Sequence, residues 1–514
     1  MQGWILRRRA SLYVLVNGAV LLASVFGMMS NDASAGVVTY TCVLFMLASV
    51  PMLWMERIND RYALLAVFMG TYFLFFGALS LRNTVLGSDL APVTVEHDAF
   101  MTAAQFAVIL GAALVLVAYR FGCHLIRPAQ QNGAAGDFAN FWVLGIGLIC
   151  WLGGSAALAY YAIVVTPENS VRATTQGLAS MGPLLTFAVM LGYLIQPLGL
   201  VILAYGYARN RTPLWLGLVL IVVLSQLLLG FVTDTKGTAL LGILLVAITQ
   251  TLWDNKLPKG WMAGVVAFAV LVFPVMQAAR VERGERGLDR ARAFEHFSEV
   301  LARAWESKEK VNEGRPGERA QTFLERSSGE ATLEPIFERV GTDTPFLNGR
   351  SLVALPYAFV PRLLLPDKED LPVGQLYSHV FLHASSDDFT YISFSQLGEL
   401  YWNFGWPGVI GGMLLTGFIL GVTGAKSSLA EVHSLTRLLV LLITIKTLCF
   451  GFGGSISVSY VVWMRAIVAI GLLHALFSRR GPAAAASSDR GAQHGDLPCG
   501  PGGAAVARFP NMMR

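Results

Sequence analysis

The chain has 514 residues, of which 54% are hydrophobic and 14% are charged. Soluble domains carry about a quarter charged residues, so this composition excludes a soluble globular protein and predicts an integral membrane protein. The net charge of +5 comes from basic residues spread along the loops rather than gathered on one face, which argues against a nucleic-acid partner.

Apolar runs of about 20 residues follow one another along most of the chain. Backbone amides inside a bilayer must be bonded within their own segment, so such runs indicate transmembrane helices. The first run lacks a convincing cleavage site and is expected to be retained. We expect an all-α polytopic protein with about twelve spans, at residues 10–29, 35–54, 62–80, 100–119, 140–163, 182–207, 213–231, 238–253, 260–276, 402–424, 437–453 and 459–477. The short connection at 233–237 leaves open that one helix of the pair around it is tilted or only partly spanning.

Basic residues near the ends of the spans predict the orientation. Lys and Arg accumulate on the cytoplasmic side, and the loops that share the side of the N-terminus hold most of them. We therefore expect a bacterial inner-membrane protein with both termini in the cytoplasm. Residues 1–276 would hold spans one to nine, 277–401 a large, partly helical periplasmic loop, 402–480 the last three spans, and 481–514 a disordered tail.

The hydrophilic segment 277–401 is where we expect the chemistry. A short helix is expected at 329–340, and closely spaced prolines after Pro345 exclude a long helix there. The segment has no cysteine, and neither a P-loop nor an HExxH motif is found at a sensible position. Asp387 and Asp388 could hold a divalent ion, but paired acids in a polar loop are usually only solvated, so no metal site is predicted.

Several basic residues gather at the membrane face that carries this segment. Because the planar fork of arginine suits bidentate contact with phosphate, a pyrophosphate at the bilayer edge is a candidate ligand. The alternative is that these residues pair with the glutamates of the loop or, within a span, snorkel to the interface. The candidates are Arg280, Arg283, Arg350, Arg362, Lys368, Arg172, Lys236 and Arg465.

Three segments resemble the O-antigen and exopolysaccharide repeat-unit polymerases of the Wzy type. They are NGRSL at 348–352, FVPRLLLPDK at 359–368 and GELYWNFGWPG at 398–408, and they follow a basic outer end on the ninth span. In addition, TKGTALL at 235–241 is similar to the Ser-Arg-Gly turn of these polymerases and of the related O-antigen ligases, with Lys236 in the Arg position. The resemblance covers about residues 232–420.

The resemblance implies a metal-independent, GT-C-like glycosyltransferase that needs no cofactor. Its donor would be an undecaprenyl-pyrophosphate-linked oligosaccharide, and it would move the growing glycan onto a new lipid-linked repeat unit. A flippase and a chain-length regulator are the implied protein partners.

This reaction needs cations for the leaving pyrophosphate and a base for the attacking hydroxyl. For the base the candidates are His379, His383 and Glu399, with Glu399 preferred because it lies in the family-like GELY stretch. A glutamate one turn before a span is equally suited to cap a helix or to pair with Arg465 or Arg362. The cations that fit are Arg280, Arg283, Arg350, Arg362 and Lys236.

Three other functions compete with a polymerase. An O-antigen ligase would use the same donor but transfer the glycan to lipid A core, and the segments at 359–368 and 398–401 favour the polymerase over it. A transporter or flippase is disfavoured because the chain shows no sequence repeat. A non-enzymatic assembly subunit is the third alternative.

Overall fold

The fold is known from a computed structural model. It describes residues 2–31, 34–86, 102–126, 140–165, 183–233, 236–268, 329–353, 355–357, 373–384, 392–429 and 434–478, with a few single positions between 272 and 302 and at 360. Within these ranges the regular structure is helical, apart from one isolated bridge between Val340 and Thr344. The predicted all-α class is confirmed for this part of the chain.

Nine of the described helices are long and apolar enough to cross a membrane, as expected of a multi-pass membrane protein. A tenth span results if α4 (Ala63–Phe76) and α5 (Ala78–Leu86), which meet at a bend of 53°, are counted together. The nine are α1 (Gln2–Asn31), α2 (Ala35–Ser49) with α3 (Pro51–Trp54), α6 (Ala103–Leu125), α7 (Asn140–Tyr160), α9 (Pro183–Asn210), α10 (Pro213–Thr233), α19 (Ser395–Ser427), α20 (Leu435–Thr444) with its continuation to Gly453, and α21 (Ile456–Ser478).

The described helices therefore do not give the expected count of twelve. Helix α11 (Lys236–Asp254) is apolar but is not counted among the nine. The alternative that one helix of this pair is only partly spanning stays a prediction. The ninth predicted span begins as α12 (Lys259–Ala267), and most of its remainder lies outside the described residues.

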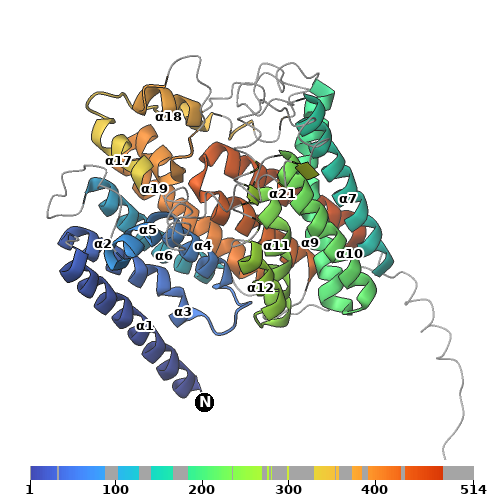
Figure 1. The fold of residues 1–514 in the computed structure, drawn as a ribbon, viewed down its shortest axis with the longest axis horizontal. Helices are drawn as coiled ribbons and strands as arrows, with labels where there is room; N and C mark the ends of the chain where they lie inside the picture. Colours follow the sequence, from blue (N-terminus) through green and yellow to red (C-terminus); the bar gives the residue numbers. More distant parts are fainter. Residues whose placement is uncertain are drawn as a thin grey trace, which may run out of the picture.

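The helices form two groups that the last two spans join (Figure 1). One group holds α1 to α6 and α19, and the other holds α7 and α9 to α12. Helix α20 contacts both α19 and α9, and α21 contacts α20 and α9. The last two spans therefore lie between the groups.

Glycines allow α6 and α19 to pack closely. A Cβ on Gly421 would lie 2.3 Å from the carbonyl oxygen of Tyr119, and one on Gly417 would lie 2.6 Å from that of Val115. Small residues let two membrane helices approach at backbone distance, where dispersion contacts are numerous. A larger residue at either glycine would separate α19 from α6 and displace the start of α19.

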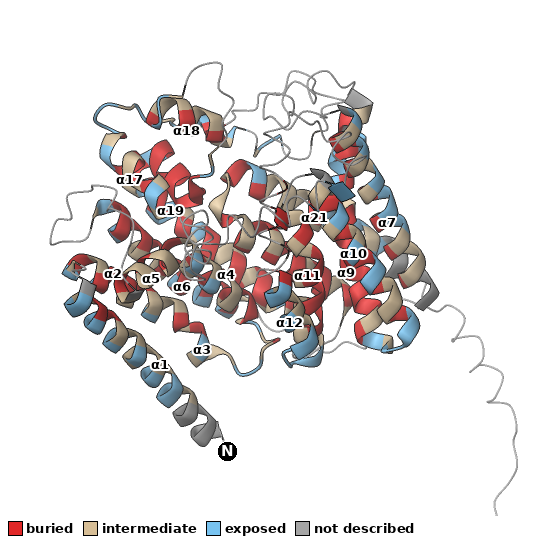
Figure 2. Cartoon of the chain, viewed as in Figure 1, coloured by how far each residue is buried: buried red, intermediate tan, exposed pale blue. Residues whose placement is uncertain are grey.

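Burial differs along the first group (Figure 2). Leu15, Leu22 and Phe26 of α1 are exposed, as expected for side chains that face lipid tails.

Helices α17 (Glu330–Arg339) and α18 (Val373–Phe381) lie near the N-terminal end of α19. The short helix predicted at 329–340 is therefore confirmed as α17. We call this end of the molecule the cap face. Most of the predicted loop 277–401, and the whole tail 481–514, lie outside the described residues.

Candidate functional site

The GELYWNFGWPG stretch forms the first turns of α19 and then breaks the helix. Gly405 has φ 62° and ψ −148°, a conformation that glycine adopts far more readily than other residues, and Pro407 has no N–H to give. The carbonyl groups of Trp402 and Asn403 thus lose their usual partners four residues later. They accept hydrogen bonds from the amides of Leu347 (2.9 Å) and Asn348 (3.1 Å) instead.

Glu399 lies at the centre of a buried polar network one turn earlier on α19. Its side chain is fully buried, and its Oε1 accepts a hydrogen bond of 2.7 Å from Ser351 Oγ. Its Oε2 accepts one of 2.7 Å from the backbone N–H of Ile456, the first residue of α21. A carboxylate at a helix N-terminus is stabilised by the free N–H groups and by the helix dipole.

Asn403 completes this network from the next turn of α19. Its Nδ2 donates to Ser351 Oγ (2.7 Å) and to the Glu399 carbonyl (2.8 Å), and its Oδ1 accepts from the Gly349 amide (2.9 Å). Ser457 Oγ also donates to the Ser351 carbonyl. The network thus ties the NGRSL segment to α19 and to α21, and we call these four side chains, Glu399, Asn403, Ser351 and Ser457, the anchor.

The geometry of Glu399 fits the capping alternative, although the helix that it caps is α21. In the described part of the chain its carboxylate contacts Ser351 and Ile456 rather than Arg465. Both oxygens are occupied and no surface reaches solvent. The role of Glu399 as a base stays a prediction.

Arg350 lies directly beside the anchor but faces outward. It begins the short 3-10 helix η3 (Arg350–Leu352), after Gly349 turns the chain with φ +85°. The guanidinium is exposed, and it has no hydrogen-bond partner among the described residues. The anchor therefore fixes the backbone of Arg350 and leaves the side chain available to a ligand.

The two candidate histidines lie where α18 ends, near α17. Nδ1 of His379 is 3.1 Å from the Ala384 carbonyl oxygen, so Nδ1–H donates and Nε2 is the atom that can accept a proton. Nε2 of His383, an exposed residue with φ 53°, is 3.4 Å from Nη1 of Arg339. Neither histidine contacts the anchor in the described part of the chain.

Of the other predicted cations, the structure describes only Lys236 and Arg465. Lys236 is the first residue of α11, and Arg465 is partly buried on α21. The remaining five lie outside the described residues: Arg172, Arg280, Arg283, Arg362 and Lys368.

The sequence reading missed Glu330, the first residue of α17. Its Oε2 accepts a hydrogen bond of 2.6 Å from Ser80 Oγ, and its Oε1 accepts one of 3.0 Å from Gln105 Nε2. These contacts join the cap face to α5 and α6. Burial raises the pKa of Glu330 to about 7, with a smaller contribution from Glu334, while the two hydrogen bonds oppose the shift.

This pKa predicts a stability that falls as the pH rises. The folded protein holds the proton more tightly than the unfolded chain, so the contribution is complete below about pH 4.5 and is lost through about pH 7. On the order of 2–3 kcal/mol is expected to disappear across this window. We expect the melting temperature of the purified protein to fall between pH 5 and pH 8, and the Glu330→Gln variant to lose most of this slope. A wild-type slope of the opposite sign would show that Glu330 is ionised when folded.

A second group that the sequence reading missed is Lys446, inside the penultimate span. A single lysine in the run LLITIKTLCF is itself a signal, because an ionisable residue within a span indicates function by default.

Among the described residues no group of three or more His, Cys, Asp or Glu side chains could hold a metal ion. Comparison of the chain with protein-family models, with curated proteins and with solved structures gives no match.

Proposed function

We propose that the chain is a polysaccharide polymerase of the Wzy type. It joins undecaprenyl-pyrophosphate-linked oligosaccharide repeat units at the periplasmic face of the bacterial inner membrane, with twelve spans and both termini in the cytoplasm. One observation carries the proposal: NGRSL and GELYWNFGWPG, two of the segments on which the resemblance rests, lie in contact through the anchor. Segments about 50 residues apart that pack as one unit suit a shared site.

In this reaction a hydroxyl of the new repeat unit attacks the anomeric carbon of the growing chain. The carbon–oxygen bond to pyrophosphate breaks, and the pyrophosphate stays on its lipid carrier. Arg350 is the described cation best placed to hold the pyrophosphate, because it is exposed on a fixed backbone. His379 Nε2 accepts the proton of the attacking hydroxyl, and Glu399 positions Arg350 through Ser351.

Deletion of the gene tests the proposal in cells. A strain without the protein is expected to make the single lipid-linked repeat unit and to fail only in extending it, because assembly of the unit precedes polymerisation. The measurement is the size distribution of the glycan, with a complemented strain as the control. Loss of all glycan transfer to the acceptor lipid, single units included, would point to the ligase, and an unchanged distribution would reject both functions.

A further inference from the structure

Lys446 lies in a π-helical turn, η4 (Ile445–Cys449), between α20 and the short helix η5 (Phe450–Gly453). Such turns are rare, and they occur frequently at functional sites. Four of the five residues of η4 are buried: Ile445, Thr447, Leu448 and Cys449. Lys446 itself is only partly buried, so its ammonium reaches the edge of the packed interior.

The ammonium of Lys446 has no hydrogen bond or ion pair within the described part of the chain. The nearby hydroxyl groups have other partners: Thr444 Oγ1 donates to the Val440 carbonyl (2.7 Å), and Thr447 Oγ1 donates to the Ile443 carbonyl (2.7 Å). A charge withdrawn from water is costly unless it is paired. An anionic partner from outside the chain would remove this cost.

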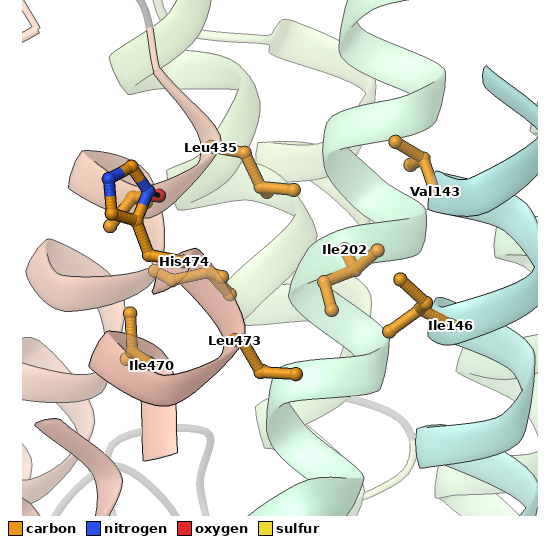
Figure 3. Close-up of a pocket in the computed structure, with 9 residues that line it drawn as sticks. Val143, Ile146, Ile202, Leu435, Ile470, Leu473 and His474 are labelled. Carbon is orange, nitrogen blue, oxygen red and sulfur yellow. Dashed lines mark hydrogen bonds between the residues drawn. The ribbon is translucent and has the colours of Figure 1, made fainter. Parts of the chain in front are cut away.

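The helix that leads into this turn contacts the second helix group: α20 contacts α9 and α11, whereas η4 itself contacts α4 and α21. Lys446 follows Leu439 by seven residues, or about two turns. Leu435 and Leu439 line a small pocket with Val143, Ile146 and Ile202 of α7 and α9, with a volume of about 20 Å³. Figure 3 shows Leu435 and Ile202 on opposite sides of this pocket. Lys446 thus lies about two turns along the same span from this apolar pocket, which has α20 and α21 on one side and α7 and α9 on the other.

Lys446 also lies near the cap face. It precedes Gly453 by seven residues, a rise of about 10 Å, and the lysine stem can extend its ammonium further toward the interface. The Gly453 carbonyl accepts a hydrogen bond from Ser393, and the Gly451 carbonyl accepts one of 3.3 Å from Gln396 of α19. This end of the span is therefore fastened to the start of the helix that carries the anchor.

We propose that Lys446 binds the phosphate of a polyprenyl diphosphate whose chain lies between the two helix groups. The inference rests on the proposed function, and it names the part of the protein that takes the lipid carrier. This apolar pocket, followed along the span by a cation that has no partner among the described residues, matches a ligand with an apolar tail and an anionic head.

The test uses purified full-length protein in nanodiscs of phosphatidylcholine, with undecaprenyl diphosphate as the probe. Lys446→Met keeps the length of the side chain and removes the charge, and Lys446→Arg keeps the charge. Lys426→Met, at an exposed lysine near the other end of α19, is the matched control. Because hydrogen bonds to charged groups are the strong ones, we expect Lys446→Met to bind about tenfold more weakly or worse. Lys446→Arg should stay within a few-fold of wild type, and Lys426→Met should be unchanged.

Normal binding by Lys446→Met would overturn the inference. So would equal, Lys446-dependent binding of phosphatidylglycerol or of inorganic pyrophosphate, because the site would then be a general anion site. Without ligand, Lys446→Met should melt no lower than wild type. If Lys446→Met and Lys446→Arg both melted at a lower temperature than wild type, the lysine would have a structural role.

The inference and the proposed function fail separately. Normal binding by Lys446→Met, together with lost extension in the deletion strain, would reject the inference alone. Lys446-dependent binding, together with normal polymer in the deletion strain, would reject the function alone.

Discussion

Replacing Glu399 by alanine is expected to lower the free energy of unfolding by roughly 3–5 kcal/mol. The substitution leaves the Ser351 hydroxyl and the Ile456 amide without their acceptor in a site that water does not reach. It also removes the negative charge at the N-terminus of α21. Of the anchor's polar contacts, only those of Asn403 and Ser457 would remain to tie the NGRSL segment to α19 and to α21.

The measurement is the melting temperature of the purified protein, together with its amount in the membrane. Glu338→Ala changes an exposed glutamate of α17 and should leave both unchanged. Glu399→Gln keeps the size of the side chain but cannot accept at both positions, so it should fall between wild type and alanine. A Glu399→Ala protein that is as stable as wild type but makes no polymer would return Glu399 to the role of base.

Replacing Arg350 by lysine is expected to cut the polymer yield about tenfold or more while the protein level stays unchanged. Lysine keeps the charge but loses the planar fork that holds two phosphate oxygens at once. The side chain is exposed and has no partner among the described residues, so its replacement should not disturb the fold.

The yield is measured as glycan length and amount in a deletion strain that carries each variant. Arg120→Lys, an exposed arginine whose guanidinium lies 5.4 Å from the centre of the Trp54 ring, is the matched control and should give normal polymer. Near-normal polymer from Arg350→Lys would remove Arg350 from the site. A variant that is lost from the membrane would instead assign it a role in folding.

Much of the helical architecture could be predicted from the sequence, because a bilayer admits few structures for an apolar run. The exact number of spans could not be predicted, since the length of an apolar run does not show that α4 and α5 bend by 53°. The span predicted at 402–424 left out the first turns of α19, which begins at Ser395 and breaks at Gly405. The consequence of this break could not be predicted either, because the amides of Leu347 and Asn348 that use the freed carbonyls are distant in the chain.

The candidate site, too, could be predicted from the sequence only in part. The family-like segments contain three of the four anchor residues, all but Ser457. The partners of Glu399 are 48 and 57 residues away and carry no local signal. The proton-accepting nitrogen of His379 is set by a carbonyl that the end of α18 brings to its ring. Lys446 could be recognised as a charge in an apolar run, whereas its place in a π-helical turn that packs on α4 and α21 required the structure.

The most direct test of the central claim uses the purified full-length protein in lipid nanodiscs with one substrate, an undecaprenyl-pyrophosphate-linked repeat unit from the host strain. We expect a ladder of lipid-linked products that differ by whole repeat units, with release of undecaprenyl diphosphate and no requirement for an added metal ion. A substrate that stays a single unit in this assay, although the same protein transfers it to lipid A core when that acceptor is added, would contradict the polymerase and identify a ligase.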